Sequence, residues 1–225
     1  MRIIDSMKLK MIRIRLERKV KKRDNLERIG SFYGGWMIPI DLLNENSICY
    51  CAGVGEDITF DLALIDRYSC QVFAFDPTPR AISYVEQKTS NIPNYQFYPI
   101  GLWTTQQKMR FYSPKNPSHV SHSITNIQQT ETFFEAECKR LFQLMSELNH
   151  NRIDLLKLDI EGAEYEVLET IIEDKLNIGI ICVEFHKPLK NVNFFVKKLI
   201  DWKFNLISAD SLFNCTFCEK KFSGG

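Results

Sequence analysis

The stretch that most constrains the fold runs from Ser47 to Asp61 and reads S-I-C-Y-C-A-G-V-G-E-D-I-T-F-D. A short apolar run leads into two glycines one residue apart, and a helix-like pattern follows. A buried strand that ends in Gly-x-Gly and passes into a helix is typical of the first β-turn-α unit of a doubly wound sheet, whose turn holds a nucleotide-like cofactor. The sequence therefore predicts an α/β fold with a mostly parallel sheet.

The acidic residues of this turn indicate the kind of cofactor. A dinucleotide site has a third glycine where this chain has Ile58, and two carboxylates in the turn would repel a pyrophosphate. The same carboxylates suit a cofactor that carries a sulfonium and an α-ammonium group and no phosphate. We therefore expect S-adenosylmethionine, held in part by Gly53, Val54, Gly55, Glu56 and Asp57.

The next apolar run, Cys70 to Phe75, reads as a second buried strand and ends in Asp76-Pro77-Thr78-Pro79. An acid about 20 residues after the glycines, at the end of the second strand, commonly binds the ribose hydroxyls of an adenosine cofactor. We therefore place Asp76 and Pro77 in the cofactor site. Thr78 and Pro79 are typical of a helix start and predict a helix to about Lys88.

Two glycine-containing segments extend the predicted cofactor site. In Ser31 to Trp36, paired glycines stand between aromatic residues, which indicates a close backbone approach to core or ligand, so we include Tyr33. The predicted third strand, Tyr95 to Tyr98, is followed by Gly101 and Leu102, which we also include. The polar segment from Ser113 to Thr130 is long for a compact domain and is typical of a lid or substrate loop.

The remaining pattern alternates strands and helices, which predicts a parallel sheet covered on both faces. Apolar spacing predicts a helix over Thr132 to Asn149. Further strands are expected at Arg152 to Leu158, at Ile178 to Phe185, near Phe204 to Ser208 and near Phe213 to Cys218, with helices ending near Glu173 and Asp201.

Charged residues follow four of the apolar strands. Because ligands bind beyond the carboxyl ends of such strands, Asp159, Glu161, Glu184 and His186 are expected near the glycine turn and Asp76. Carboxylate oxygens are the ligands that Mg²⁺ prefers, so Asp159, Glu161 and Glu184 form a candidate metal site. A hydroxyl acceptor needs a base or a metal, so we assign Asp159, His186 and Glu161 as candidate catalytic residues.

Composition limits the number of domains. With 225 residues and 44% apolar content, the chain has room for one α/β domain, which we place at residues 31–225. Nine Lys or Arg against one Glu in residues 8–23 predict a basic amphipathic helix, and we treat residues 1–30 as an arm. This arm is expected to contact a membrane surface, an anionic glycan carrier or a partner, or only to cap the domain.

The cellular compartment is also predicted from patterns. No apolar run is long enough for a membrane span, and the N-terminus has no apolar signal-peptide region. Seven cysteines without a regular spacing are typical of reduced thiols. We expect a cytoplasmic protein, peripheral to the membrane at most, and no nucleic-acid partner.

The strongest motif is Ile153-Asp154-Leu155-Leu156-Lys157-Leu158-Asp159-Ile160-Glu161-Gly162-Ala163-Glu164, which resembles the signature of the FkbM family of S-adenosylmethionine-dependent methyltransferases. Val72 to Pro79 and Val183-Glu184-Phe185-His186 are similar to its second-strand and fifth-strand motifs. The resemblance implies a seven-stranded, Rossmann-like class I methyltransferase fold and O-methylation of a sugar hydroxyl in polysaccharide, glycolipid or secondary-metabolite biosynthesis.

One position departs from the family. An acid commonly precedes its glycine turn, whereas this chain has Cys51-Ala52-Gly53, so Glu56, Asp57 or Asp159 is left to hold the methionine ammonium group. Two other functions stay open beside the sugar O-methyltransferase. One is a nicotinamide oxidoreductase, disfavoured by Ile58 and the acidic turn, and the other is a non-enzymatic Rossmann-like binding module at a membrane or glycan-synthesis complex.

Overall fold

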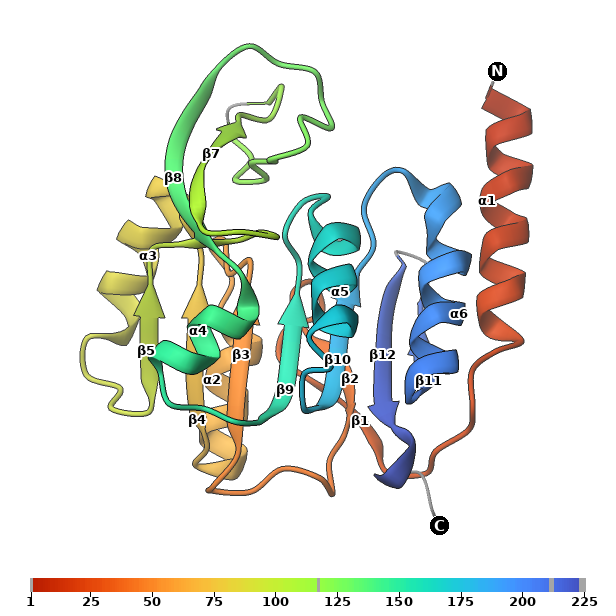
Figure 1. Cartoon of the computed structure of the whole chain (residues 1–225), viewed down its shortest axis with the longest axis horizontal. Helices are drawn as coiled ribbons and strands as arrows, with labels where there is room; N and C mark the ends of the chain where they lie inside the picture. Colours follow the sequence, from red (N-terminus) through yellow and green to blue (C-terminus); the bar gives the residue numbers. More distant parts are fainter. Residues whose placement is uncertain (1, 117, 211–212, 223–225) are drawn as a thin grey trace.

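A seven-stranded sheet forms the centre of the structure, and helices cover both of its faces (Figure 1). The computed structural model describes residues 2–116, 118–210 and 213–222. The strand order is β11-β12-β10-β9-β3-β4-β5, and the pairs are parallel except for β12, which is antiparallel to both β10 and β11. This order confirms the expected seven-stranded, mostly parallel sheet of the class I methyltransferase fold.

The strands of this sheet are β3 (Ile48–Ala52), β4 (Gln71–Phe75), β5 (Tyr95–Tyr98), β9 (Ile153–Leu158), β10 (Ile178–Glu184), β11 (Phe204–Ala209) and β12 (Asn214–Glu219). The helices are α1 (Arg2–Glu17), α2 (Thr59–Tyr68), α3 (Pro79–Thr89), α4 (Leu141–Glu147), α5 (Glu164–Glu173) and α6 (Val192–Trp202), with 3-10 turns η1 (Leu189–Asn191) and η2 (Lys220–Phe222). Two small sheets join β1 (Leu26–Ile29) to β2 (Trp36–Pro39), and β6 (Gly101–Leu102) and β7 (Gln107–Tyr112) to β8 (Phe133–Lys139).

The central strands read as continuous apolar runs because both of their faces are buried. Along β3, Cys49 and Cys51 face one core with α2 and α3, whereas Tyr50 and Ala52 face the other core with α4, α5 and α6. This alternation places the strand ends, and not the strand faces, in reach of a ligand.

The glycine turn after β3 is held by close backbone approach and by an aspartate. Gly53 has φ +77°, and a Cβ atom there would lie 1.6 Å from the carbonyl oxygen of Asp159. The carboxylate of Asp76, which follows β4, accepts hydrogen bonds from the backbone N–H groups of Val54 and Gly55 at 3.0 and 2.9 Å. The turn therefore needs glycine at position 53 and joins the ends of three strands.

The helix predicted over Thr132 to Asn149 is wrong in its first half. Residues Phe133–Lys139 form strand β8, which pairs antiparallel with β7, and only Leu141–Glu147 is helical. Burial alternates along β8, and Phe134 stacks on Phe111 of β7 at a ring-centroid distance of 5.2 Å. Pairing with a strand more than twenty residues away outweighs the local helical spacing.

Helix α1 lies along the outer side of α6 at the edge of the molecule (Figure 1). Leu16 is buried against the core, and Ile12 and Val20 are partly buried there. The hairpin of β1 and β2 follows, so backbone pairing crosses residue 30. Among the described residues, no helix combines the length and the apolar character that crossing a membrane would require.

Replacing Gly53 by alanine tests the turn. We expect Gly53→Ala to lower the free energy of unfolding by about 2 to 5 kcal/mol, because it adds a left-handed backbone penalty to a clash with the Asp159 carbonyl. Gly55→Ala is the matched control, since Gly55 also has positive φ but a Cβ there would meet only Val120, at 3.4 Å. Its cost should be about 1 kcal/mol. Urea unfolding of both variants measures this, and equal costs would contradict the explanation.

Candidate active site

A first pocket opens at the carboxyl ends of β3, β4 and β9. All of the residues predicted to bind the cofactor line it, namely Tyr33, Gly53, Val54, Gly55, Glu56, Asp57, Asp76, Pro77, Gly101, Leu102 and Asp159. The polar loop before β8 forms another wall through Val120, Ser121, His122 and Ile124. Residues from several separated segments thus surround one cavity, although contact of each with a cofactor stays a prediction.

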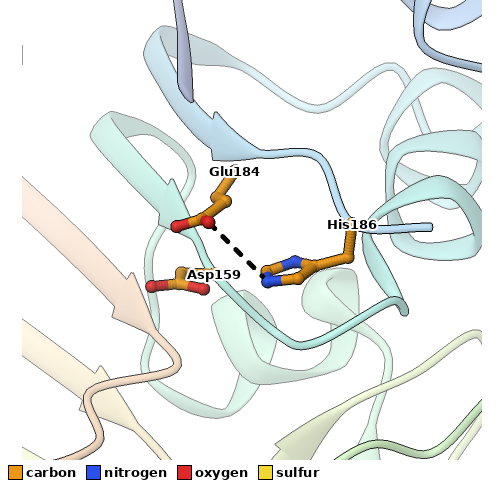
Figure 2. A group of neighbouring side chains, drawn as sticks. All are labelled: Asp159, Glu184 and His186. Carbon is orange, nitrogen blue, oxygen red and sulfur yellow. Dashed lines mark ion pairs between the residues drawn. The ribbon is translucent and has the colours of Figure 1, made fainter. Parts of the chain in front are cut away.

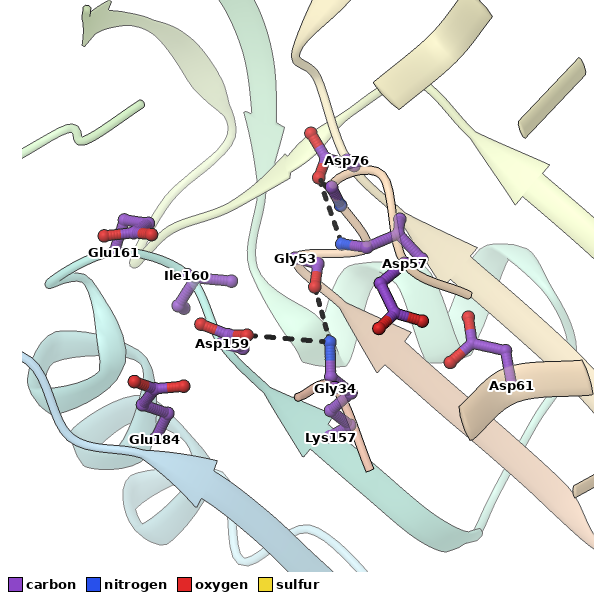
Figure 3. Close-up of polar contacts among 12 residues, drawn as sticks. Gly34, Gly53, Asp57, Asp61, Asp76, Lys157, Asp159, Ile160, Glu161 and Glu184 are labelled. Carbon is purple, nitrogen blue, oxygen red and sulfur yellow. Dashed lines mark hydrogen bonds and ion pairs between the residues drawn. The ribbon is translucent and has the colours of Figure 1, made fainter. Parts of the chain in front are cut away.

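The acids of this pocket differ in their partners (Figure 3). The carboxylate of Asp76 accepts four hydrogen bonds, two from the glycine turn and two from the backbone N–H and hydroxyl of Thr78. Asp57 accepts hydrogen bonds from the hydroxyls of Ser31 and Thr59. Glu56 forms a half-exposed ion pair with Arg80 at 2.6 Å. Asp76 therefore orders the turn in addition to its predicted role at the ribose.

Lys157 is a site residue to which we assigned no role from the sequence. It lies in β9 and is 4% exposed, and its ammonium group donates to the carbonyl oxygen of Gly53 and lies 3.9 Å from Oδ2 of Asp159 (Figure 3). Burial alone would lower the pKa of Lys157, but the nearby carboxylates of Asp159 and Asp61 raise it above its usual value. A lysine inside a buried strand whose only other charged residue is Asp154 was the available signal.

Four charged groups meet beyond β9 and β10. One ligand atom each from Asp159, Glu184 and His186 can be chosen so that all lie within 4.8 Å of one another (Figure 2). Glu161, the third predicted metal ligand, has Oε2 at 3.4 Å from Nε2 of His186. The residues that could hold a cation are therefore the two predicted carboxylates Asp159 and Glu184 with His186, and Glu161 lies beside them.

Glu164 orients the imidazole of His186. Its side chain is fully buried, accepts hydrogen bonds from the backbone N–H groups of Ile160 and Gly162, and has Oε1 at 2.9 Å from Nδ1 of His186. The other ring nitrogen, Nε2, is left facing Glu161 and Glu184. From the sequence, Glu164 fits a cap of the following helix slightly better than a chemical role, because its contact with His186 depends on the register of β9 and β10.

The charged side chains of this cluster shift one another's pKa values. Burial by itself lowers the pKa of His186, but the hydrogen bond and charge of Glu164, with those of Glu161 and Asp159, raise it to about 10. Burial, followed by repulsion from Asp159, raises the pKa of Glu184 to about 7. Without a bound cation His186 is therefore protonated at neutral pH, and it must lose this proton before it can act as the predicted base.

A second pocket adjoins the first. It measures about 320 Å³, a size found among small-molecule sites. Glu161 and Ser121 line both pockets, whereas Asp159 lines only the first and His186 only the second. Glu161 has a left-handed backbone, with φ +51°, and Gly162 follows at +100°. This turn places the carboxylate of Glu161 at the junction of the two cavities.

The fold and this strand-end site define a Rossmann-like class I methyltransferase architecture. The family model described as the methyltransferase FkbM domain matches residues 44–206. The chain belongs to this family, which confirms the resemblance found in the sequence and the cofactor expected from it, S-adenosylmethionine.

Individual relatives are more distant. The chain is 27% identical over 146 residues to the human probable methyltransferase-like protein 24, and 27% over 139 residues to the rat protein of that name. These matches cover 64% and 61% of this chain but only 33% and 32% of the relatives, so the chain spans about a third of their length.

Solved structures of similar shape include an rRNA methylase from Streptococcus thermophilus, with 16% identity, a TM-score of 0.47, and coverage of 80% of this chain and 90% of that one. A putative methyltransferase from Streptococcus mutans in complex with SAH has 17% identity, a TM-score of 0.48, and coverage of 80% and 92%.

The hydrogen bond between Glu164 and His186 predicts a large pKa change in a single variant. In Glu164→Gln the pKa of His186 should fall from about 10 toward its ordinary value, because the main group that raises it loses its charge. NMR titration of the imidazole in the presence of a chelator measures it. Glu161→Gln serves as the comparison and should lower the pKa less, since Glu161 acts on His186 without this hydrogen bond.

The raised pKa of His186 also predicts how the stability of the fold changes with pH. A His pKa that is raised in the folded state contributes stability that is fully present below the unfolded value of about 6.5 and is lost as pH rises through about 10. The loss between these limits should be smaller in Glu164→Gln than in the native chain. An unchanged pKa of His186 in this variant would contradict the pairing.

Proposed function

We propose that this chain transfers a methyl group from S-adenosylmethionine to a hydroxyl group of a sugar or glycan. The observation that carries the proposal is the junction of the two pockets. The first contains the residues predicted to bind the cofactor, and the second is open to an acceptor. Glu161 lines both cavities, with Asp159 on the side of the first and His186 on the side of the second.

The lining of the second pocket favours a polyhydroxylated acceptor. Hydroxyl and amide side chains that can exchange hydrogen bonds with sugar hydroxyls form most of its wall. They are Tyr112, Ser113, Ser121, Ser123, Asn126 and Gln128. Lys187 and the protonated His186 are the cations among the described lining residues, and His186 is paired with Glu164 and Glu161, so the pocket offers little net positive charge to the phosphates of a nucleic acid.

The reaction is an in-line displacement. The acceptor oxygen forms a bond to the methyl carbon while the bond from that carbon to sulfur breaks, and the sulfur keeps the electron pair as a thioether. The hydroxyl proton passes to a carboxylate or imidazole at the junction, with Asp159 and His186 as the predicted bases. Alignment of oxygen, carbon and sulfur supplies much of the rate.

Loss of Asp159 tests this function. With labelled S-adenosylmethionine and a panel of free oligosaccharides, nucleotide sugars and lipid-linked sugars, the native chain should label a saccharide. Asp159→Ala should lower that rate by roughly 10²- to 10⁴-fold, the contribution of a positioned base. Asp66→Ala, an exposed aspartate on α2, is the matched control and should keep full activity.

Two results would contradict the proposal. Labelling of an RNA transcript and of no saccharide would move the acceptor to nucleic acid. Calorimetric binding of S-adenosylmethionine without transfer to any acceptor would favour the alternative function, a non-enzymatic binding module.

We further propose that the arm, residues 1–30, brings a cytoplasmic enzyme to an anionic membrane surface. Helix α1 contacts α6 with one side, while Met7, Met11 and Ile14 on the other side are 62%, 50% and 37% exposed. Arg15 lies beside this apolar stripe and Arg18 follows it just after α1. Both are exposed and form no ion pair within the part of the chain that the structure describes. An exposed apolar stripe with flanking cations is typical of a helix that lies in a lipid interface.

Vesicle flotation tests the arm. The full chain should bind vesicles that contain phosphatidylglycerol and not those of phosphatidylcholine alone, and added salt should weaken the binding. The double variant Arg15→Glu, Arg18→Glu should weaken it roughly 30-fold or more, at about 1 kcal/mol for each lost cation. The control Lys88→Glu, Lys108→Glu changes the net charge equally at exposed positions on α3 and β7. Equal loss in both variants would contradict a role for the arm.

A further inference from the structure

We propose that Asp159, Glu184 and His186 form a centre for a divalent transition-metal ion such as Mn²⁺. This differs from the Mg²⁺ site expected from the sequence in one ligand, because an imidazole takes the place of Glu161. The binding site stands on its own geometry, whereas its chemical use rests on the proposed methyl transfer.

The register of two neighbouring strands brings the carboxylates together. Leu158 of β9 pairs with Val183 of β10, so Asp159 and Glu184 are the next residues along two adjacent parallel strands. His186 follows two residues later, and Figure 2 shows its ring turned toward both carboxylates. Ligand atoms within 4.8 Å of one another can close around one ion with small side-chain movements.

The buried carboxylate of Glu164 is a second, independent indication of a metal centre. It is fully buried and fixed by backbone N–H groups, and it accepts a hydrogen bond from the imidazole when Nδ1 carries the proton. That bond selects the tautomer of His186 whose Nε2 lone pair faces Glu184 Oε1, 3.8 Å away. Metal-binding histidines usually donate their second ring N–H to such a carboxylate.

The donor set decides the class of ion. Mg²⁺ prefers oxygen ligands only. Imidazole nitrogen suits transition-metal ions such as Fe²⁺ and Zn²⁺, and carboxylates suit Mn²⁺, so a set of two carboxylates and one imidazole favours a divalent transition-metal ion. Two carboxylates and one imidazole would leave further coordination positions for water or substrate, and His186 lines the second pocket. When bound, such an ion would act as a Lewis acid that lowers the pKa of an acceptor hydroxyl. It would then replace His186 and Asp159 as the means of activating that hydroxyl, because both side chains would be its ligands.

Binding of Mn²⁺ to the full-length chain, stripped with a chelator, tests the proposal. We expect one Mn²⁺ per chain by calorimetry and by loss of the free-ion electron paramagnetic resonance signal, with weaker binding of Mg²⁺. Pulsed electron paramagnetic resonance of the bound Mn²⁺ should show echo modulation from one directly bound imidazole nitrogen. His186→Ala should remove that modulation and weaken Mn²⁺ binding roughly 100-fold, and Glu164→Gln should weaken it roughly 10- to 100-fold.

The matched control is His119→Ala, the same change at an exposed loop histidine, which should leave Mn²⁺ binding unchanged. Two results would overturn the metal centre. One is the absence of stoichiometric Mn²⁺ binding, and the other is Mn²⁺ binding that shows no nitrogen modulation and is unchanged in His186→Ala. Thermal melts of each variant separate loss of a ligand from loss of the fold.

The two proposals can fail separately. Methyl transfer to a saccharide that persists in excess chelator, with no Mn²⁺ bound, would overturn the metal centre and leave the proposed function standing. Stoichiometric Mn²⁺ binding through His186, with no transfer to any acceptor, would support the centre and contradict the proposed function.

Discussion

The structure around the site depends on one buried cation. Lys157 extends from the middle of the sheet and holds the carbonyl oxygen of the glycine turn, close to the carboxylate of Asp159. It also compensates Asp61, which is 1% exposed. Without this ammonium group, two carboxylates and a carbonyl would face one another in a poorly solvated space, which is costly unless a charge partner is present. The glycine turn and the end of β9 are therefore one electrostatic unit.

The other polar residues of the site are arranged around the glycine turn and the end of β9. Asp76 orders the glycine turn from one side, and the chain leaves β9 through Asp159 and Glu161 on the other. Glu164 then fixes both the loop that carries Glu161 and the ring of His186. Each acid has a protein partner that sets its position, so the geometry of the junction is established before a ligand binds.

The sequence was sufficient for the fold and for the location of much of the candidate site, for a physical reason. Continuous apolar runs mark strands buried on both faces, and in a parallel sheet their ends must meet at one edge. Asp76 and Asp159 could be placed at that edge from their positions alone. Strand β8 was missed because its apolar spacing fits a helix and only its partner β7 decides between the two. The contacts of Lys157 with Gly53 and of Glu164 with His186 join segments that are far apart in the sequence, so the local sequence pattern could not predict them.

The two pockets have walls of different origin. Strand ends of the central sheet form most of the first pocket, whereas the segment between β7 and β8, which includes Ser121, Ser123 and Asn126, forms much of the second. Substitutions in that segment leave the hydrogen bonds of the sheet untouched. Ser123 and Asn126 of this segment line only the second pocket, so during divergence changes at such positions can reshape the second cavity while the strand ends that line the first are inherited unchanged.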